Sequence, residues 1–118
     1  MQMRDNAPIL IFMGWEVEYA DEFKAWRNTL DEQDRSQLTM SVKLLEKYGP
    51  VLKFPYSSQI NDSKHSRTRE LRTQSKGRPL RTLDAFDPLR VAILLIGGNK
   101  RGTQDWYAKY IAKADELL

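Results

Sequence analysis

The basic residues of this sequence are concentrated in one stretch, and their types and spacing are the first indication of chemistry. Between Ser63 and Thr82 the only acidic residue is Glu70, and seven basic residues accompany it: Lys64, Arg67, Arg69, Arg72, Lys76, Arg78 and Arg81. The stretch carries a net charge of +6, whereas the whole chain of 118 residues carries +3, so the remainder is acidic, at −3. Such a local excess favours a polyanionic partner, most often a nucleic acid. A solvated basic loop explains the charge alone equally well.

Strand geometry divides these basic residues between two faces. Residues two apart in a strand point to the same side, so Glu70 and Arg72 share one face while Arg69 and Leu71 share the other. Leu71 is expected to pack against helices, which leaves Arg72 on the open face. Arg81 lies in the next predicted strand, and the same alternation directs it outward from the core.

Further polar residues follow the most apolar strand of the chain. Lys100 and Arg101 come directly after that strand, and Tyr107 lies one turn into the helix that follows. Because antiparallel neighbours stand about 5 Å apart, these side chains are expected to converge with Arg72 and Arg81 on one concave surface. Several cations around a phosphate, with a phenol nearby, suit phosphodiester cleavage without a metal. The cations stabilise the charge that develops on the phosphate, and a titratable group moves a proton.

Each of these residues also has a purely structural interpretation. An arginine on an exposed strand is most often solvated or weakly ion-paired. Tyr107 stands beside Trp106, a pairing that is typical of core packing. His65, the only histidine, lies in a predicted loop between Lys64 and Ser66 and indicates little by itself.

The composition excludes several classes of site. The chain has no cysteine, which rules out disulfides, cysteine-ligated zinc and cysteine nucleophiles. One histidine cannot supply the histidine pair of some ribonucleases or a three-histidine zinc site. Asp84 and Asp87 are candidates for magnesium, but they are distant in sequence from other carboxylates, so neither a metal nor another cofactor is expected.

The N-terminal half of the predicted fold is a strand and a helical hairpin. Alternation of apolar and acidic residues predicts a strand over 15–19, after which Asp21 is expected to cap a helix. A second helix is predicted to open between Asp31 and Asp34 and to end at Gly49 and Pro50. The apolar stripes of the two helices are Phe23, Trp26 and Leu30 in the first and Leu38, Val42, Leu45 and Tyr48 in the second.

The C-terminal half reads as a long surface segment, three strands and a helix. Residues 51–66 carry few regular signals, and strands are predicted over 67–74, 79–86 and 90–96. The last strand is apolar on both faces, which indicates the centre of a sheet, and the chain leaves it through Gly97 and Gly98. Thr103 is expected to cap a final helix that contains Trp106 and Tyr107. The order βααβββα is that of an α+β domain with a mostly antiparallel sheet, a helical hairpin on one face and a C-terminal helix.

A single domain over residues 14–118 is expected, preceded by a loose extension, residues 1–13. The apolar run Ile9–Met13 is too short for the core of a signal peptide or for a membrane span. A cytoplasmic protein without membrane contact is therefore the expectation.

Five short motifs, taken together, resemble those of one protein family. These are Lys64-His65-Ser66-Arg67-Thr68-Arg69-Glu70-Leu71-Arg72, Gly77-Arg78-Pro79-Leu80-Arg81, Ala85-Phe86-Asp87-Pro88, Ile93-Leu94-Leu95-Ile96-Gly97-Gly98-Asn99-Lys100 and Trp106-Tyr107. In this order they are similar to the phage-derived Gp49-like branch of the RelE/HigB toxins, the toxin halves of type II toxin–antitoxin modules. The resemblance covers about residues 15–118.

The resemblance implies an activity as well as a RelE-like βααβββα fold. Proteins of this kind are mRNA interferases, which cut messenger RNA without a metal, usually in the ribosomal A site, through attack of the ribose 2′-hydroxyl on the adjacent phosphate. It implies a cytoplasmic endoribonuclease with mRNA on the ribosome as its substrate and a cognate antitoxin, expected to be a helix-turn-helix protein, as its partner.

The site residues are assigned by the same resemblance. The residues expected to be catalytic are Arg72, Arg81, Arg101 and Tyr107. Those expected to bind RNA are Lys64, His65, Arg67, Arg69, Lys76, Arg78 and Lys100. Arg81 and Arg101 are expected to stabilise the phosphate and Arg72 to orient the RNA, while Lys64, His65 and Tyr107 all remain candidates for proton transfer.

Two other functions remain open at this stage. The related ParE toxins share the fold but poison DNA gyrase, so the scaffold alone does not make a nuclease. An inactivated phage-derived domain that only binds an antitoxin is the third interpretation.

Overall fold

The computed structural model describes residues 14–61, 63–65, 68–101 and 105–118. The expected extension over residues 1–13, together with Arg67 and the expected helix cap Thr103, lies outside the described residues. The described elements are β1 (Glu16–Tyr19), α2 (Asp21–Asn28), α3 (Glu32–Tyr48), the 3₁₀ helix η1 (Gly49–Val51), β2 (Ser57–Gln59), β3 (Thr68–Ser75), β4 (Arg78–Phe86), β5 (Val91–Asn99) and α4 (Trp106–Leu117).

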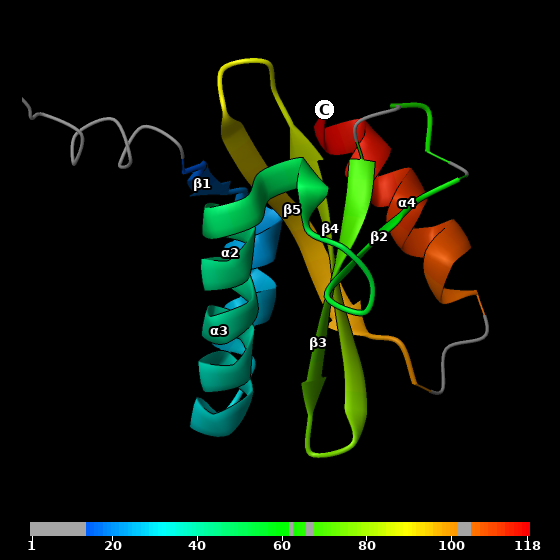
Figure 1. Cartoon of the computed structure of the whole chain (residues 1–118). Coiled ribbons are helices and arrows are strands. Elements are labelled where there is room, and N and C mark those ends of the chain that lie inside the picture. The colour runs from blue at the N-terminus through cyan, green and yellow to red at the C-terminus, as the bar shows by residue number, and fades with distance from the viewer. Residues whose placement is uncertain (1–13, 62, 66–67, 102–104) are drawn as a thin grey trace, which may run out of the picture.

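One five-stranded sheet organises the molecule, in the order β1-β5-β4-β3-β2. β1 runs parallel to β5, and the other neighbours are antiparallel. The helical pair α2 and α3 lies on one side of the sheet and α4 lies on the other (Figure 1). The expected α+β class, mostly antiparallel sheet, helical hairpin and C-terminal helix are confirmed.

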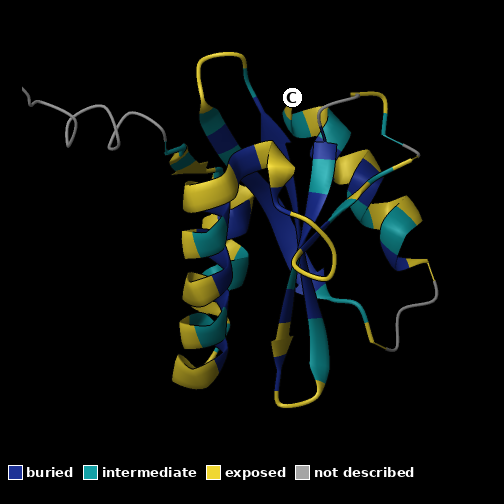
Figure 2. Cartoon of the chain, viewed as in Figure 1, coloured by how far each residue is buried: buried dark blue, intermediate teal, exposed yellow. Residues whose placement is uncertain are grey.

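The alternation of the central strands builds a separate apolar core on each face of the sheet. On the side of α2 and α3 the buried residues are Phe23, Leu38, Val42, Leu45, Leu52, Leu71, Phe86, Ala92 and Leu94. On the side of α4 they are Leu83, Ala85, Leu95, Ile96, Trp106, Ile111 and Ala114. The central strands are therefore buried on both faces (Figure 2), and burial of each large apolar side chain stabilises the fold by about 1.5–3 kcal/mol.

Both ends of α3 follow the expected local chemistry. The carboxylate of Asp31 accepts a hydrogen bond from the amide of Asp34 at 2.9 Å, which satisfies a donor that the first turn leaves free. Gly49 ends the helix with a φ of 58°, and a side chain there would meet the indole of Trp15 at 2.1 Å. Tyr48, expected in the buried stripe, is instead exposed. It is the last residue of α3. In α2, Ala20 occupies the cap position and Asp21 is the first helical residue.

Two features of the sheet differ from the sequence expectation. Within the segment expected to be irregular, Ser57–Gln59 forms the strand β2, which pairs with β3. Because β2 has no apolar alternation, the edge of β3 determines this pairing. β5 continues through Gly97 and Gly98, where the chain was expected to leave the sheet. A Cβ at Gly97 would lie 2.3 Å from the Trp26 ring, and one at Gly98 would lie 3.0 Å from Trp106. The two glycines let aromatic rings pack closely on opposite faces of one strand.

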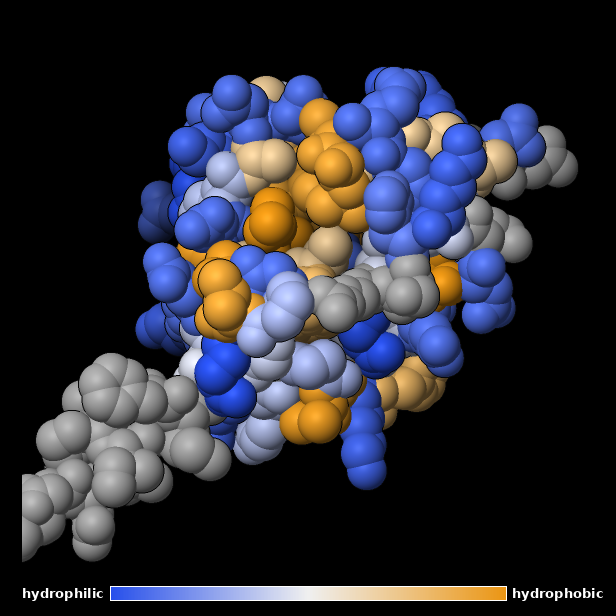
Figure 3. All heavy atoms as spheres, turned by 90° about the horizontal axis from the view of Figure 1, so that it is seen from above, coloured by the Kyte–Doolittle hydropathy of each residue, from blue (hydrophilic) through white to orange (hydrophobic). Residues whose placement is uncertain are grey.

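Apolar residues also reach the surface. Figure 3 shows them gathered near the middle of the face seen from above, with hydrophilic residues around them. The large apolar residues most exposed in the described part of the chain include Val51, Phe54, Tyr56 and Leu89. Within the described residues, no helix has both the length and the apolar character needed to cross a membrane.

Candidate active site

A buried carboxylate, Glu70 of β3, lies at the centre of the candidate site. Its side chain is only 3% exposed. One oxygen, Oε2, accepts hydrogen bonds from the Ser58 hydroxyl at 2.6 Å and from the Arg72 guanidinium at 3.3 Å. The other, Oε1, accepts a hydrogen bond from the Tyr107 phenol and lies 3.7 Å from Nε of Arg81. Four neighbours from four elements thus share one carboxylate.

Strand register explains why these residues meet. Glu70 and Arg72 are two apart in β3 and face α4, and Arg72 stands directly opposite Arg81 of β4. Tyr107 is the second residue of α4, which packs over this face. Lys100, just after β5, places its ammonium 4.8 Å from the centre of the Tyr107 ring. The convergence of Arg72, Arg81 and Tyr107 expected from alternation is therefore present, with Lys100 beside it.

The environment of Tyr107 keeps its proton in place. Burial raises the pKa of the phenol, and the hydrogen bond to Glu70 together with the negative charge of that carboxylate raises it further, to about 12. At neutral pH the phenol is therefore protonated and acts as a hydrogen-bond donor to Glu70.

Arg81 is a buried cation with unused donor capacity. It is 5% exposed and donates one hydrogen bond, from Nη1 to the Leu80 carbonyl at 3.0 Å. Its Nε has no hydrogen-bond partner among the described residues. A buried guanidinium N–H without an acceptor is costly. The ion pair with Glu70 Oε1 at 3.7 Å offsets part of this cost.

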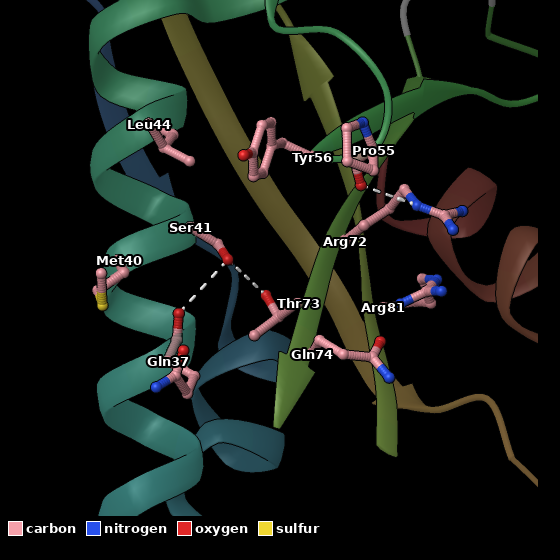
Figure 4. Close-up of a pocket in the computed structure, with 10 residues that line it drawn as sticks. All are labelled: Gln37, Met40, Ser41, Leu44, Pro55, Tyr56, Arg72, Thr73, Gln74 and Arg81. Atoms are coloured by element: carbon pink, nitrogen blue, oxygen red, sulfur yellow. Dashed lines mark hydrogen bonds between the residues drawn. The ribbon is translucent and has the colours of Figure 1, made fainter. Parts of the chain in front are cut away.

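A groove of about 370 Å³ opens beside the two arginines. It runs along β3 between α3 and the segment that precedes β2. Ten residues line it: Gln37, Met40, Ser41, Leu44, Pro55, Tyr56, Arg72, Thr73, Gln74 and Arg81. Arg72 and Arg81 extend from their strands on the side away from α3 (Figure 4). The groove therefore lies on the α3 side of β3, while the guanidinium groups of the cationic cluster point to the other side (Figure 4).

Arg69, expected to bind RNA, and Arg101, expected to be catalytic, both have protein partners outside the Glu70 cluster. Arg69 faces α2 and α3 and donates to the Ser57 hydroxyl at 3.1 Å and to the Leu52 carbonyl at 3.3 Å. Arg101 donates to the Gly77 carbonyl in the β3–β4 turn. The structure thus separates these two arginines from the Glu70 cluster.

Lys76 and Arg78 occupy the far tip of the β3–β4 hairpin. Lys76 pairs with Asp31 and lies 3.7 Å from Asp34, and Arg78 pairs with Asp34. Both cations therefore hold the hairpin against the beginning of α3 instead of facing the groove.

Lys64 and His65 lie against the other end of α4. The Lys64 amide and the Ser63 hydroxyl both donate to the Asp115 carboxylate, at 3.0 and 2.6 Å. Asp115 follows Tyr107 by eight residues, which is about 12 Å along a helix. The backbone of this segment is therefore anchored well away from the Tyr107 phenol.

Sequence reasoning assigned no role to Glu70 or Ser58. Glu70 was counted only as an opposing charge, although its alternation with Arg72 placed it on the active face. A lone carboxylate among seven cations was the available signal. Ser58 carried no signal, because its position depends on the unexpected strand β2.

The two aspartates considered for magnesium have other surroundings. Asp84 is completely buried, which raises the pKa of its carboxyl well above the usual value, and neither oxygen has a hydrogen-bond partner among the described residues. Asp87 accepts hydrogen bonds from the amides of Leu89 and Val91 in the β4–β5 turn. No cluster of three His, Asp or Glu side chains suited to a metal occurs within the described part of the chain.

The family model of phage-derived Gp49-like proteins (DUF891) matches residues 25–118. The chain belongs to the Gp49-like family. The Gp49-like chain is 38% identical over 108 residues to HigB2 of Mycobacterium tuberculosis (strain ATCC 25618 / H37Rv), which is named as a toxin. That alignment covers 90% of this chain and 53% of HigB2, so the chain spans about half the length of this relative.

Two further proteins are similar to this Gp49-like chain. HigB3 of the same strain, also named as a toxin, is 38% identical over 96 residues, which cover 80% of this chain and 82% of HigB3. A mutant of the E. coli toxin RelE in the free state matches with a TM-score of 0.63 at 9% sequence identity, over 90% of this chain and 99% of RelE. The RelE match shows the fold alone. With the two HigB relatives it confirms the expected place of the chain in the RelE/HigB toxin superfamily.

Proposed function

We propose that this chain is the toxin of a type II toxin–antitoxin module and acts as a metal-independent, ribosome-dependent mRNA endoribonuclease. The observation that carries the proposal is the Glu70 carboxylate set between Arg72, Arg81 and the Tyr107 phenol. Phosphodiester cleavage by a ribose hydroxyl needs a proton acceptor and cations that stabilise the phosphate. Glu70 and the two arginines supply these groups on one face of the sheet. The names of the HigB relatives and the fold shared with RelE support the same conclusion.

In the proposed reaction the RNA phosphate approaches on the side of β3 and β4 to which the two guanidinium groups point (Figure 4), and it accepts hydrogen bonds from Arg72 and Arg81. Glu70 takes the proton of the attacking 2′-hydroxyl, the new bond from the 2′-oxygen to phosphorus displaces the 5′-oxygen, and solvent water gives the leaving 5′-oxygen its proton. The other neighbours of Glu70 hold the carboxylate in position. Tyr107, whose pKa is about 12, serves as the donor that orients Glu70. Lys100 adds positive charge at the edge of the site.

The remaining expectations follow from this function. The substrate is mRNA on the ribosome, the site of action is the cytoplasm, and the neutralising partner is a cognate antitoxin of the helix-turn-helix type. In this proposal Arg72 and Arg81 contact the reacting phosphate. Arg101, Arg69, Lys76 and Arg78 hold the protein surface around them.

The test is mRNA cleavage in a purified translation system, mapped by primer extension. Wild-type protein is expected to cut mRNA within codons, leaving a 5′-hydroxyl and a 2′,3′-cyclic or 3′-phosphate end, and a 2′-deoxynucleotide at the cut position is expected to block that cut. Glu70→Gln keeps the shape of the side chain but removes the proton acceptor, so it is expected to slow single-turnover cleavage by about 100-fold.

Other outcomes separate the alternatives. Intact mRNA with DNA breakage in the presence of gyrase contradicts the proposal and indicates a ParE-like poison. Intact mRNA and DNA, with normal growth on expression, indicate an inactive antitoxin-binding domain. Cleavage that leaves a 5′-phosphate contradicts attack by the 2′-hydroxyl.

A further inference from the structure

Two aromatic side chains are exposed on the segment that joins η1 to β2. Phe54 is 69% exposed and Tyr56 is 52% exposed, and Lys53 and Pro55 are their neighbours. A single exposed aromatic residue needs no explanation. Here two exposed aromatic residues lie within four residues of chain and beside a cationic site. The proposed cleavage reaction assigns them no role.

The segment is held in place by the protein on both sides. The amides of Tyr56 and Ser57 donate to the Lys53 carbonyl at 2.9 and 3.1 Å. Arg72 donates twice to the segment, from its amide to the Tyr56 carbonyl at 2.8 Å and from Nε to the Pro55 carbonyl at 3.0 Å. The aromatic side chains are therefore displayed on an ordered backbone whose main anchor is a residue of the active site.

Arg72 connects the aromatic residues directly to the Glu70 cluster. The carbon at the centre of its guanidinium lies 4.7 Å from the centre of the Phe54 ring, while Nη1 of the same group lies 3.3 Å from Glu70. Guanidinium–ring stacking of this kind is favourable. Arg72 thus stands between the reacting carboxylate and an aromatic ring, most of whose surface still faces solvent.

Tyr56 lies on the other side of Arg72, where it lines the groove with Pro55 and Leu44 of α3 (Figure 4). Phe54 is the ring that stacks against the Arg72 guanidinium, and it is 69% exposed. An exposed flat ring beside a guanidinium suits one planar heteroaromatic group that is attached to a phosphate.

We infer that Phe54 is the base-stacking platform of the RNA site. An unpaired nucleobase next to the scissile phosphate stacks on the Phe54 ring, and its phosphate reaches Arg72 and Arg81. Proteins that bind single-stranded RNA combine aromatic rings with arginines in this way, because bases offer a π-face and the backbone offers charge. The inference rests on the proposed function and adds to it the residue that positions the nucleotide.

The experiment measures binding of a short single-stranded oligoribonucleotide whose 2′-oxygens are methylated, so that it cannot be cut. Phe54→Ala is expected to weaken binding by about 5- to 150-fold, the equivalent of about 1–3 kcal/mol for the loss of one stacked base. Phe54→Trp is expected to keep or improve binding, and Phe54→Leu, which retains apolar bulk without a ring, to behave like Phe54→Ala. Leu89→Ala is the matched control, since Leu89 is 82% exposed and lies in the β4–β5 turn.

A second arm replaces single nucleotides by abasic residues. One position is expected to weaken binding to wild-type protein, while Phe54→Ala shows no further loss at that same position. Thermal unfolding of each variant checks the fold, and single-turnover cleavage of ribosome-bound mRNA is expected to show a higher half-saturating toxin concentration for Phe54→Ala with a smaller change in maximal rate.

The outcomes distinguish this inference from the proposed cleavage. Wild-type affinity of Phe54→Ala for every oligonucleotide overturns the platform, even where cleavage by the wild-type protein persists. Loss of antitoxin binding with unchanged RNA binding also overturns it, since the aromatic segment is then a protein interface. Stacking at one position by a protein that cuts no mRNA leaves the platform in place and overturns the proposed reaction.

Discussion

Two buried carboxylates of this molecule each have arginine, serine and one further donor as neighbours. They differ in whether the neighbouring cations join elements of the fold or line a groove. Asp34, at the beginning of α3, pairs with Arg78, accepts a hydrogen bond from Ser75 at 2.6 Å and has Lys76 nearby. Glu70, in β3, has Arg72, Arg81, Ser58 and Tyr107 around it. Both side chains are buried and both meet basic residues of the same stretch.

The difference lies in the arginines. Arg78 and Lys76 bridge two elements at the hairpin tip, so their charge is used to hold β3 and β4 against α3. Arg81 lies 3.7 Å from Glu70 through an Nε that has no hydrogen-bond partner among the described residues, and both it and Arg72 line a groove. The comparison teaches that a cluster of charges is a candidate site where its donors are not all used to join elements of the fold.

The largest expected effect is the difference in mRNA cleavage between a variant of the Glu70 cluster and a variant of the Asp34 cluster. Arg81→Ala is expected to reduce single-turnover mRNA cleavage by roughly 10²–10³-fold, because a preorganised donor to the phosphate is lost. Arg78→Ala is expected to keep cleavage within a few-fold of wild type while lowering the melting temperature. Equal losses of activity in the two variants contradict the distinction between the clusters.

The next effect concerns stability and its pH dependence. The hydrogen bond from Ser75 lowers the pKa of Asp34 below its usual value of 3.8, with Arg78 acting in the same direction against the effect of burial. Asp34 therefore stabilises the fold fully above pH 3.8, and this contribution is lost as the pH falls further, through the folded-state pKa. Asp34→Asn is expected to lower the free energy of unfolding at neutral pH by about 1–3 kcal/mol.

Denaturant unfolding between pH 7 and pH 2 checks this prediction. The difference between wild type and Asp34→Asn is expected to shrink below pH 3.8, and mRNA cleavage at neutral pH is expected to change little. A constant difference across the whole range contradicts the assigned role of the charge.

A smaller effect on cleavage than that of Arg81→Ala is expected at Tyr107. Tyr107→Phe removes the donor that orients Glu70 but leaves the proton acceptor and both arginines, so cleavage is expected to fall about 10- to 150-fold, as for one hydrogen bond to a charged group. Because the pKa of Tyr107 is raised from 10 to about 12, the phenol stabilises the folded state below pH 10. That contribution is lost as the pH rises through about 12.

Unfolding measured from pH 8 to pH 12 separates the two roles of the phenol. Wild type is expected to lose more stability than Tyr107→Phe over the alkaline part of this range, while the cleavage rate of wild type shows no step that reports a tyrosine titrating near neutral pH. A tyrosine-dependent step below pH 9 contradicts the assignment of Tyr107 as a donor.

The elements and their faces could be predicted from local pattern. The cap at Asp31, the stop at Gly49, the period-two alternation of β3 and the apolar run of β5 each act within a few residues of chain, so the sequence already contains their causes. The same alternation correctly placed Arg72 and Arg69 on opposite faces of β3. The face of Arg72 was expected to be open and Arg81 to point outward, but α4 packs over this face and Arg81 is 5% exposed.

The pairings across the chain could not be predicted in this way. Whether a cation belongs to a site depends on which distant acceptor it meets: the Asp34 carboxylate for Arg78, the Gly77 backbone carbonyl for Arg101 and the Glu70 carboxylate for Arg81. A count of charges treats these three arginines as equal, because it does not show which acceptor each guanidinium meets in the fold.

By itself, therefore, the sequence determined an α+β domain with a concentration of positive charge on β3 and β4, since local propensity and periodicity are properties of neighbouring residues. Only the tertiary structure decided that Glu70 is the centre of the site, that Tyr107 is its donor, and that Phe54 lies beside Arg72. These contacts join residues that stand 37 and 18 positions apart, and only strand register and the packing of α4 bring them together.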